Sequence, residues 1–256
     1  MHDLERESTK QNLKSSYHTK GSHLFVYENQ YYRWITFSDG IIQGVMEREN
    51  PAKVVAPIVQ AFLLFLLTPR PSTKILNLGL GTGAIERAIK ELTQHTSFQL
   101  DNIISVELSE EIVNCAKTNF EFIPSTLHIG CAEKYIYDTG LQFDVILLDI
   151  IHTEQGNDFL QKKIFWKNVN KTLSSDGQII FNFNIYCEHA LLYLLKLLNI
   201  HFQSIHLIEF HDYKNIIISA HKVRDVVLTC EKIENTQILN RIVPQLSASI
   251  KKILKL

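Results

Sequence analysis

The chain has 256 residues, of which 45% are hydrophobic, enough for the core of one large domain or of a large domain with a small appendage. Its 26 basic residues nearly balance its 27 acidic residues, which disfavours a polyanion such as nucleic acid as a partner. The four cysteines form no CxxC pair, so the sequence indicates neither a zinc site nor a disulfide framework, and we expect no metal.

Nothing in the sequence predicts a membrane segment. The opening stretch MHDLERESTKQNLKSS is polar and charged, unlike a signal peptide. The most apolar run, residues 54–67, contains a proline and is shorter than the roughly 20 residues that a bilayer span requires. We therefore expect a cytoplasmic protein.

Four segments follow one another along the chain. Residues 1–22 are polar and without periodicity, and we expect a flexible arm. Residues 23–50 alternate apolar and polar residues and are rich in aromatics, so they predict a small N-terminal antiparallel β unit. Residues 51–222 predict an α/β core with a leading helix over residues 52–67. Residues 223–256 are amphipathic and predict a C-terminal helical extension.

The core alternates strands and helices at the spacing of a parallel sheet with crossover helices. Five apolar runs predict its parallel strands, at residues 75–78, 103–106, 126–129, 143–148 and 178–183. Two further strands, residues 204–209 and 215–220, are joined by a link too short for a parallel crossover and predict an antiparallel hairpin. The predicted fold is therefore α/β, a Rossmann-like methyltransferase fold with a mostly parallel seven-stranded sheet.

A glycine-rich turn follows the first core strand. Gly79, Gly81 and Gly83 separate an apolar strand from a helix in the stretch KILNLGLGTGAIERAIK. Glycine permits a tight reversal and leaves room for a ligand at the helix N-terminus. Glu107 ends the second strand, where an acid accepts hydrogen bonds from a ribose diol in dinucleotide-binding and related folds. Together they predict a nucleoside site; the alternative is a structural turn beside a solvated glutamate.

Polar residues also end the next strands. Asp149 ends the fourth core strand, and Asn182 and Asn184 end the fifth. Ligands of open α/β sheets bind at the carboxyl ends of the strands, so we expect Asp149 to lie in the site. The alternative is an acid that caps a helix or braces a loop.

The order of these parts resembles the spermidine synthase, or polyamine aminopropyltransferase, family. The stretch SDGIIQ at residues 38–43 is similar to the family's LDGxxQ hairpin, and the glycine turn, Glu107 and the strand FDVILLD are close matches. The resemblance covers about residues 23–222 and marks a divergent member. It implies a class I S-adenosylmethionine-dependent methyltransferase-like fold, a homodimer, and transfer of an aminopropyl group to a small-molecule amine in polyamine biosynthesis.

The resemblance also implies roles for individual residues. The three glycines would contact S-adenosylmethionine, its decarboxylated form or methylthioadenosine. Glu107 would bind the ribose hydroxyls and Leu108 would flank the adenine. Asp149 would be the acid nearest the reaction, where an acid is needed because an amine arrives protonated.

The cofactor-binding part departs from the family pattern at two places. Thr82 stands where the family usually has an aspartate that holds the amino end of the cofactor. Cys131, followed by Ala132, stands where an acid usually binds the adenine amino group, with Glu133 as a displaced substitute. Thr82, Cys131 and Ala132 are nevertheless predicted cofactor contacts.

A third departure affects the amine site. The family's second acid after Asp149 is missing at its usual spacing, where this chain continues Ile150-Ile151-His152-Thr153-Glu154. His152 has the imidazole of a base that works near neutral pH, and Glu154 can supply the missing charge. Both are predicted catalytic residues beside Asp149, with ordinary loop residues as the alternative.

Three functions stay open on the sequence. The first is aminopropyl transfer from decarboxylated S-adenosylmethionine. The second is methyl transfer from intact S-adenosylmethionine to a small molecule, and the third is a catalytically silent relative that binds a nucleoside or only dimerises. Thr82 and the missing second acid favour the latter two, whereas the N-terminal β unit and SDGIIQ favour the first.

Overall fold

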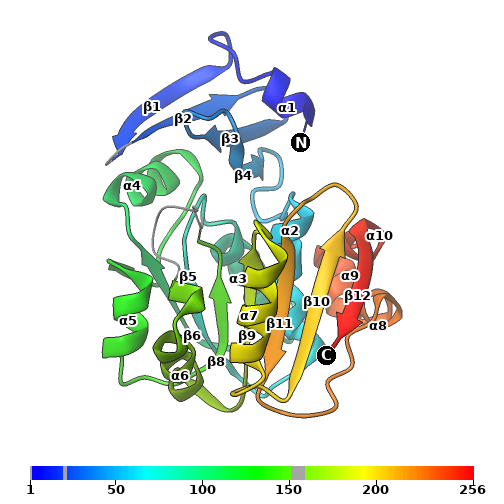
Figure 1. The fold of residues 1–256 in the computed structure, drawn as a ribbon. Helices are drawn as coiled ribbons and strands as arrows, with labels where there is room; N and C mark the ends of the chain where they lie inside the picture. Colours follow the sequence, from blue (N-terminus) through cyan, green and yellow to red (C-terminus); the bar gives the residue numbers. More distant parts are fainter. Residues whose placement is uncertain (1, 20–21, 151–158) are drawn as a thin grey trace.

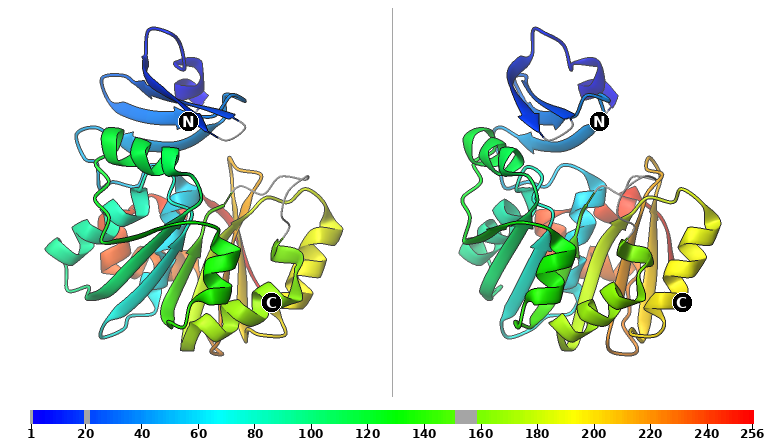
Figure 2. Two further views of the ribbon diagram at one scale, coloured as in Figure 1. Left: turned by 90° about the vertical axis from the view of Figure 1, so that its left-hand side faces the viewer. Right: turned by 60° about the vertical axis from the view of Figure 1, so that its left-hand side comes forward.

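Two sheets organise the chain. A computed structural model describes residues 2–19, 22–150 and 159–256. A four-stranded antiparallel sheet stands above the edge of an eight-stranded sheet that carries helices on both faces (Figures 1 and 2). None of the helices in the described ranges is long and apolar enough to cross a bilayer.

The N-terminal β unit predicted from the sequence is confirmed. After the short helix α1 (His2–Arg6) come the strands β1 (Leu13–Thr19), β2 (Ser22–Glu28), β3 (Tyr32–Thr36) and β4 (Ile42–Glu47). One face of this sheet buries Leu24, Val26 and Ile35 against the helix α4 (Glu110–Asn119). The other face packs Trp34 against Leu4 of α1. The period-2 alternation of these strands thus serves two contact surfaces.

The expectation of a flexible arm over residues 1–22 is corrected by the structure. β1 pairs with β2 in antiparallel register, with Tyr17 opposite Leu24. The Tyr17 hydroxyl accepts a 2.7 Å hydrogen bond from Asn119 in α4, and Trp34 Nε1 donates to Ser8 Oγ at 2.9 Å. These long-range contacts order a segment whose local composition lacks any periodic signal.

The core sheet has the order β12-β10-β11-β9-β8-β5-β6-β7. Its parallel strands are β5 (Thr73–Leu78), β6 (Leu100–Glu107), β7 (Thr126–Ile129), β8 (Phe143–Leu148) and β9 (Leu173–Phe183). β10 (Ser204–Phe210) and β11 (Ile216–His221) form the predicted antiparallel hairpin. All seven predicted strands are therefore present, and the fold class is confirmed.

Helices cover the two faces of this sheet in separate groups. One face carries α2 (Pro57–Gln60), the 3-10 helix η1 (Ala61–Leu67), α3 (Ala84–His95), α8 (Cys230–Asn235), α9 (Gln237–Ile242) and α10 (Leu246–Ser249). The other face carries α5 (Ala132–Asp138), η2 (Phe159–Gln161), α6 (Lys163–Thr172) and α7 (Glu188–Leu198). Because both faces are covered, the strands are apolar on both sides, as parallel sheets require.

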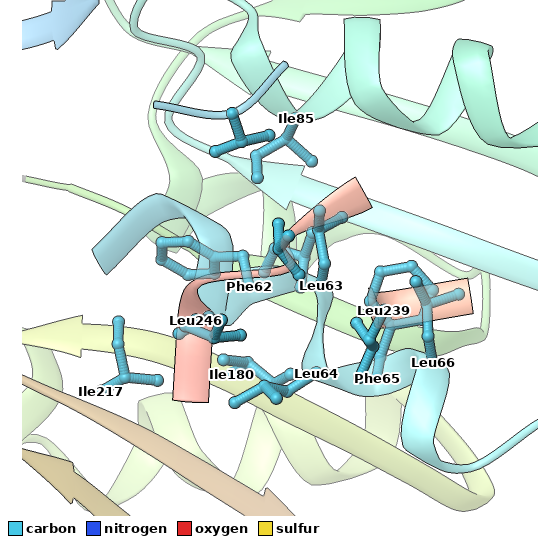
Figure 3. Packing of buried hydrophobic residues seen from close by; sticks show 14 of the residues in the cluster. Phe62, Leu63, Leu64, Phe65, Leu66, Ile85, Ile180, Ile217, Leu239 and Leu246 are labelled. Atoms are coloured by element: carbon cyan, nitrogen blue, oxygen red, sulfur yellow. The ribbon is translucent and has the colours of Figure 1, made fainter. Parts of the chain in front are cut away.

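The leading helix is shorter than the range 52–67 predicts. Helical structure begins at Pro57, which suits the first turn because its missing N–H would have no partner there. All seven residues of η1 are buried, and Figure 3 shows Phe62 and Leu63 in the same cluster of buried side chains as Leu246 of α10. Val54, which precedes the first helical residue Pro57, instead forms an antiparallel β-bridge with Met46 of β4.

The C-terminal segment is helical only in part. α8, α9 and α10 agree with a helical extension, but β12 (Ile250–Lys255) is a strand that pairs antiparallel with β10. The sheet therefore has an eighth strand beyond the seven predicted. Six residues are too few to separate a helical from a strand period in the sequence.

Candidate functional site

The carboxyl ends of the parallel strands form the candidate site. β5 lies between β8 and β6: the chain builds β6 and β7 on one side of β5 and then crosses to the other side with β8. Open α/β sheets bind ligands at this type of switch point. Glu107 is the last residue of β6, and the glycine turn, Cys131 and Asp149 follow β5, β7 and β8, which end at the same edge.

The three glycines of the turn all have positive φ, 94° at Gly79, 54° at Gly81 and 72° at Gly83. A Cβ on Gly79 would collide with the backbone carbonyl of Asp149, and a Cβ on Gly83 would lie 2.8 Å from the ring of Phe122. Gly81 differs, since no atom lies within 4 Å of its Cβ position. Two glycines are thus needed for packing, while Gly81 leaves open space beside the backbone.

Glu107 connects the glycine turn to the start of α4. Its side chain is buried, and its Oε2 accepts a 3.0 Å hydrogen bond from the backbone N–H of Leu80. Its Oε1 accepts another, also 3.0 Å, from the backbone N–H of Ser109. Each carboxylate oxygen retains a lone pair for a further donor, so the group is held ready to accept hydroxyl hydrogens. Leu108, beside it, is 73% exposed.

Asp149 takes part in a hydrogen-bond chain across three strand ends. Its Oδ1 accepts a 3.0 Å hydrogen bond from Asn182 Nδ2, and Asn182 Oδ1 accepts a 3.0 Å hydrogen bond from Asn215 Nδ2. The surrounding protein desolvates the Asp149 carboxyl and raises its pKa, while the hydrogen bond from Asn182 lowers it. The residue as a whole keeps solvent-accessible surface, so its neighbours desolvate the carboxyl only in part. A carboxylate with a raised pKa at a strand end is suited to receive a proton.

Thr82 lies at the joint between the two sheets. Its side chain is buried, and a Cβ added to Gly44 of β4 would approach its Cγ2 to 2.5 Å. Its backbone carbonyl accepts a 2.5 Å hydrogen bond from Arg87. The residue predicted to contact the cofactor thus packs against the N-terminal sheet.

The other predicted residues fall in three different settings. Cys131 is exposed at the N-terminus of α5 and Ala132 is buried. Glu133, considered as a substitute for the adenine-binding acid, is instead bound by Lys162 Nζ at 2.8 and 3.1 Å. His152 and Glu154 lie outside the described residues.

Sequence reasoning missed Arg87 and Asn215. Arg87 is buried in the first turns of α3, where its guanidinium donates to the carbonyls of Pro51, Thr82 and Phe120 at 2.5 to 2.7 Å. It thereby ties the linker after β4 to the glycine turn and to the end of α4. A single sequence does not reveal that an arginine is buried. The one local indication is that this arginine lies in the helix that follows a glycine turn.

Two further observations bear on the chemistry of the chain. Among residues 2–19, 22–150 and 159–256, no three His, Cys, Asp or Glu side chains are placed to hold a metal ion. A cavity of about 310 Å³ lies away from the strand edge, lined by Arg33, Arg48, Glu49 and Glu121 among others. Arg33 and Arg48 contact Glu28 in β2, whereas Glu121 follows α4, so this cavity lies between the N-terminal sheet and the end of α4.

The fold is a mixed α/β fold whose mostly parallel sheet, with an antiparallel terminal hairpin, is preceded by an N-terminal antiparallel β unit. The chain matches no family model. It is 30% identical over 170 residues to a polyamine aminopropyltransferase of Vibrio vulnificus, covering 62% of this chain and 55% of that protein. The chain spans about half the length of the curated relatives that it matches.

Solved structures agree on the fold. A probable spermidine synthase of Corynebacterium glutamicum superposes with a TM-score of 0.71 at 14% identity, over 90% of this chain and 86% of that one. Human methyltransferase-like protein 13, solved in complex with SAH, gives 0.63 at 19% identity, over 74% and 93%. The resemblance seen in the sequence is confirmed: the chain is similar in sequence to polyamine aminopropyltransferases and has the fold of spermidine synthases.

Proposed function

We propose that the chain is a spermidine synthase-like transferase that moves an aminopropyl group from decarboxylated S-adenosylmethionine to a small-molecule amine. The observation that carries this proposal is its sequence similarity to polyamine aminopropyltransferases, 30% over 170 residues. A homodimer and a cytoplasmic location belong to the same proposal, and light scattering of the purified chain tests the first.

The edge site supports the binding half of this proposal. The open space beside Gly81 gives the cofactor access to the backbone of the glycine turn. The Glu107 carboxylate, already held by two backbone N–H groups, would accept the ribose hydroxyls. The exposed Leu108 would lie against the adenine.

Asp149 supports the chemical half. The acceptor ammonium would transfer a proton to the Asp149 carboxylate, and the freed lone pair would attack the aminopropyl carbon bonded to the sulfonium sulfur. The new C–N bond forms as the C–S bond breaks, the bonding pair moves to sulfur, and neutral methylthioadenosine leaves. Since the sulfonium is already a good leaving group, positioning the two reactants supplies much of the remainder.

Methyl transfer from intact S-adenosylmethionine is the second candidate. Thr82 offers no carboxylate to the amino end of the cofactor, and its side chain packs against Gly44. No acid at position 82 therefore discriminates between the two cofactors by their charge.

Calorimetric titration with S-adenosylmethionine, its decarboxylated form and methylthioadenosine, followed by turnover with a panel of amines, separates these functions. Preference for the decarboxylated form with release of methylthioadenosine supports aminopropyl transfer, whereas preference for the intact form with release of S-adenosylhomocysteine supports methyl transfer. Asp149→Asn should abolish turnover, and the exposed acid Asp138, changed to Asn, is the matched control. Binding of none of the three would refute both.

A further inference from the structure

We infer that Asn182 and Asn215 are positioning residues for Asp149, and that together they direct an incoming proton to one carboxylate oxygen, Oδ2. That the proton comes from the amine substrate rests on the proposed function, whereas the positioning of Asp149 does not depend on it. The three side chains lie at neighbouring strands: Asp149 directly follows β8, Asn182 lies in β9 and Asn215 directly precedes β11.

The strand register places the three side chains together. Leu148 pairs with Phe181, so Asp149 and Asn182 are the next residues along two adjacent parallel strands. Asn182 pairs with Ile217 of β11, and Asn215 stands two residues before Ile217. Because residues two apart share one face of a sheet, Asn215 lies on the face of Asn182. Both amides are half-buried.

The chain of hydrogen bonds has a fixed direction. Asn215 Nδ2 donates to Asn182 Oδ1, which leaves the NH2 end of Asn182 to face Asp149. A reversed Asn182 would set its carbonyl against the carboxylate and its NH2 against that of Asn215, losing both bonds. The Asp149 carboxylate, which can only accept, and the Asn215 donor together fix which end of the Asn182 amide meets Asp149.

This direction distinguishes the two oxygens of Asp149. Oδ1 accepts from Asn182 at 3.0 Å, and in the described part of the chain Oδ2 has no hydrogen-bond partner. A proton on Oδ1 would compete with the Asn182 donor, whereas a proton on Oδ2 leaves that bond intact. Oδ2 is thus the oxygen that faces an amine and receives its proton.

The neighbours of Asp149 present amide and backbone groups. β5 brings the backbone of Leu78 and Gly79, β9 brings Asn182 and β11 brings Asn215. Within the ranges that the structure covers, no charged side chain lies within ion-pair distance of the Asp149 carboxylate. The Asn182 hydrogen bond lowers the pKa that desolvation raises, so its removal has a defined sign.

A titration followed by NMR of 13C-labelled aspartate tests the inference without requiring activity. Asp149→Asn identifies the Asp149 carboxyl signal. We expect its titration midpoint to move upward in Asn182→Ala and, by a smaller amount, in Asn215→Ala. Asn170→Ala is the matched control, since Asn170 is a half-buried amide that donates to the His201 carbonyl at 3.0 Å on another part of the core. The titration midpoint of Asp149 in Asn170→Ala should equal that in the wild type.

Kinetics provide the second readout. If the wild type transfers aminopropyl groups, Asn182→Ala should lower kcat about tenfold, the worth of one hydrogen bond to a charged group, and shift the acid limb of its pH profile upward. KM for decarboxylated S-adenosylmethionine should not change.

The outcomes separate the two proposals. A wild type without aminopropyl transfer whose Asp149 midpoint still shifts in Asn182→Ala refutes the proposed function and supports the positioning. An active wild type whose midpoint is the same in Asn182→Ala and Asn170→Ala overturns the positioning alone. Should Asn182→Ala fail to fold, Asn215→Ala decides, because an unchanged midpoint there removes the directed chain.

Discussion

The backbone N–H of Leu80, in the glycine turn, donates a 3.0 Å hydrogen bond to Oε2 of Glu107 at the end of β6. One carboxylate thus closes the turn after the first core strand onto the tip of the second. Since Oε1 holds Ser109 at the same time, Glu107 shapes the turn as well as offering a charge to a ligand. If Glu107 binds the ribose as proposed, ligand binding and local order at this edge depend on the same side chain.

Changing Glu107 should therefore reduce both properties. We expect Glu107→Ala to weaken binding of methylthioadenosine by about 1–3 kcal/mol, because charged hydrogen bonds are lost. Glu107→Gln keeps the size and one acceptor oxygen and should fall between Ala and the wild type. Calorimetry measures the affinity, and equal affinities for all three proteins would refute the ribose assignment.

Gly79 and Gly81 should respond differently to alanine. Gly79→Ala puts a Cβ into the Asp149 carbonyl at a φ of 94°, so we expect the free energy of unfolding to fall by more than about 3 kcal/mol. Gly81→Ala has open space and should cost only about 1 kcal/mol for its left-handed backbone, while its methyl group obstructs the ligand. Urea denaturation and ligand titration of both variants test this contrast. Similar unfolding costs for the two would contradict it.

Arg87→Lys should destabilise the junction of linker, turn and α4. Burial lowers the pKa of Arg87 to about 10, yet its guanidinium serves three carbonyls at once. A lysine cannot span all three, so we expect a loss of about 3 kcal/mol in the free energy of unfolding. Arg241→Lys is the control, because among the described residues that exposed arginine donates to the His95 carbonyl alone, and it should change stability little. Equal effects of the two substitutions would show that the three-way contact contributes nothing.

Acid should destabilise the hairpin of β10 and β11. Burial is the main cause that lowers the pKa of His221 to about 3, and His206, 5.8 Å away between ring centroids, also has a lowered pKa. Below pH 6.5 the unfolded chain binds a proton that the folded His221 refuses, so stability falls as the pH decreases from 6.5 toward 3.

We expect His221 to account for a loss of about 3 kcal/mol between pH 7 and 4.5. Chemical denaturation at both pH values measures it. His221→Gln should show a smaller loss than the wild type, and the exposed His211, changed to Gln, should not. An identical pH dependence in all three proteins would exclude His221 as the cause.

The sequence predicted the parallel core closely because its strands are buried on both faces. The range 143–148 agrees with the buried strand β8, and the range 126–129 agrees with β7, a short edge strand whose sequence TLHI alternates polar and apolar residues. β1 and β12 escaped prediction because neither segment, LKSSYHT or IKKILK, is an apolar run or alternates regularly between apolar and polar residues. Their residues are largely exposed and their order comes from partners distant in the sequence.

The same distinction applies to the site. Glu107 and the glycines could be predicted as site residues because of their spacing relative to the apolar strands. Asn182 was recognised only as a strand-end residue, and Asn215 not at all, since their link to Asp149 depends on β9 lying between β8 and β11. Strand order is a property of the assembled sheet, which local spacing does not contain.

Gly44 and Thr82 share a single small volume between β4 and the glycine turn. The residue at each position therefore limits which residues fit at the other. An alanine at 44 requires a smaller residue at 82, and a bulkier residue at 82 requires glycine at 44. The two positions should vary as a pair among relatives that keep this joint. An acid introduced at position 82 would fit only while residue 44 is glycine. Thr82→Asp therefore also tests how the N-terminal sheet packs against the glycine turn.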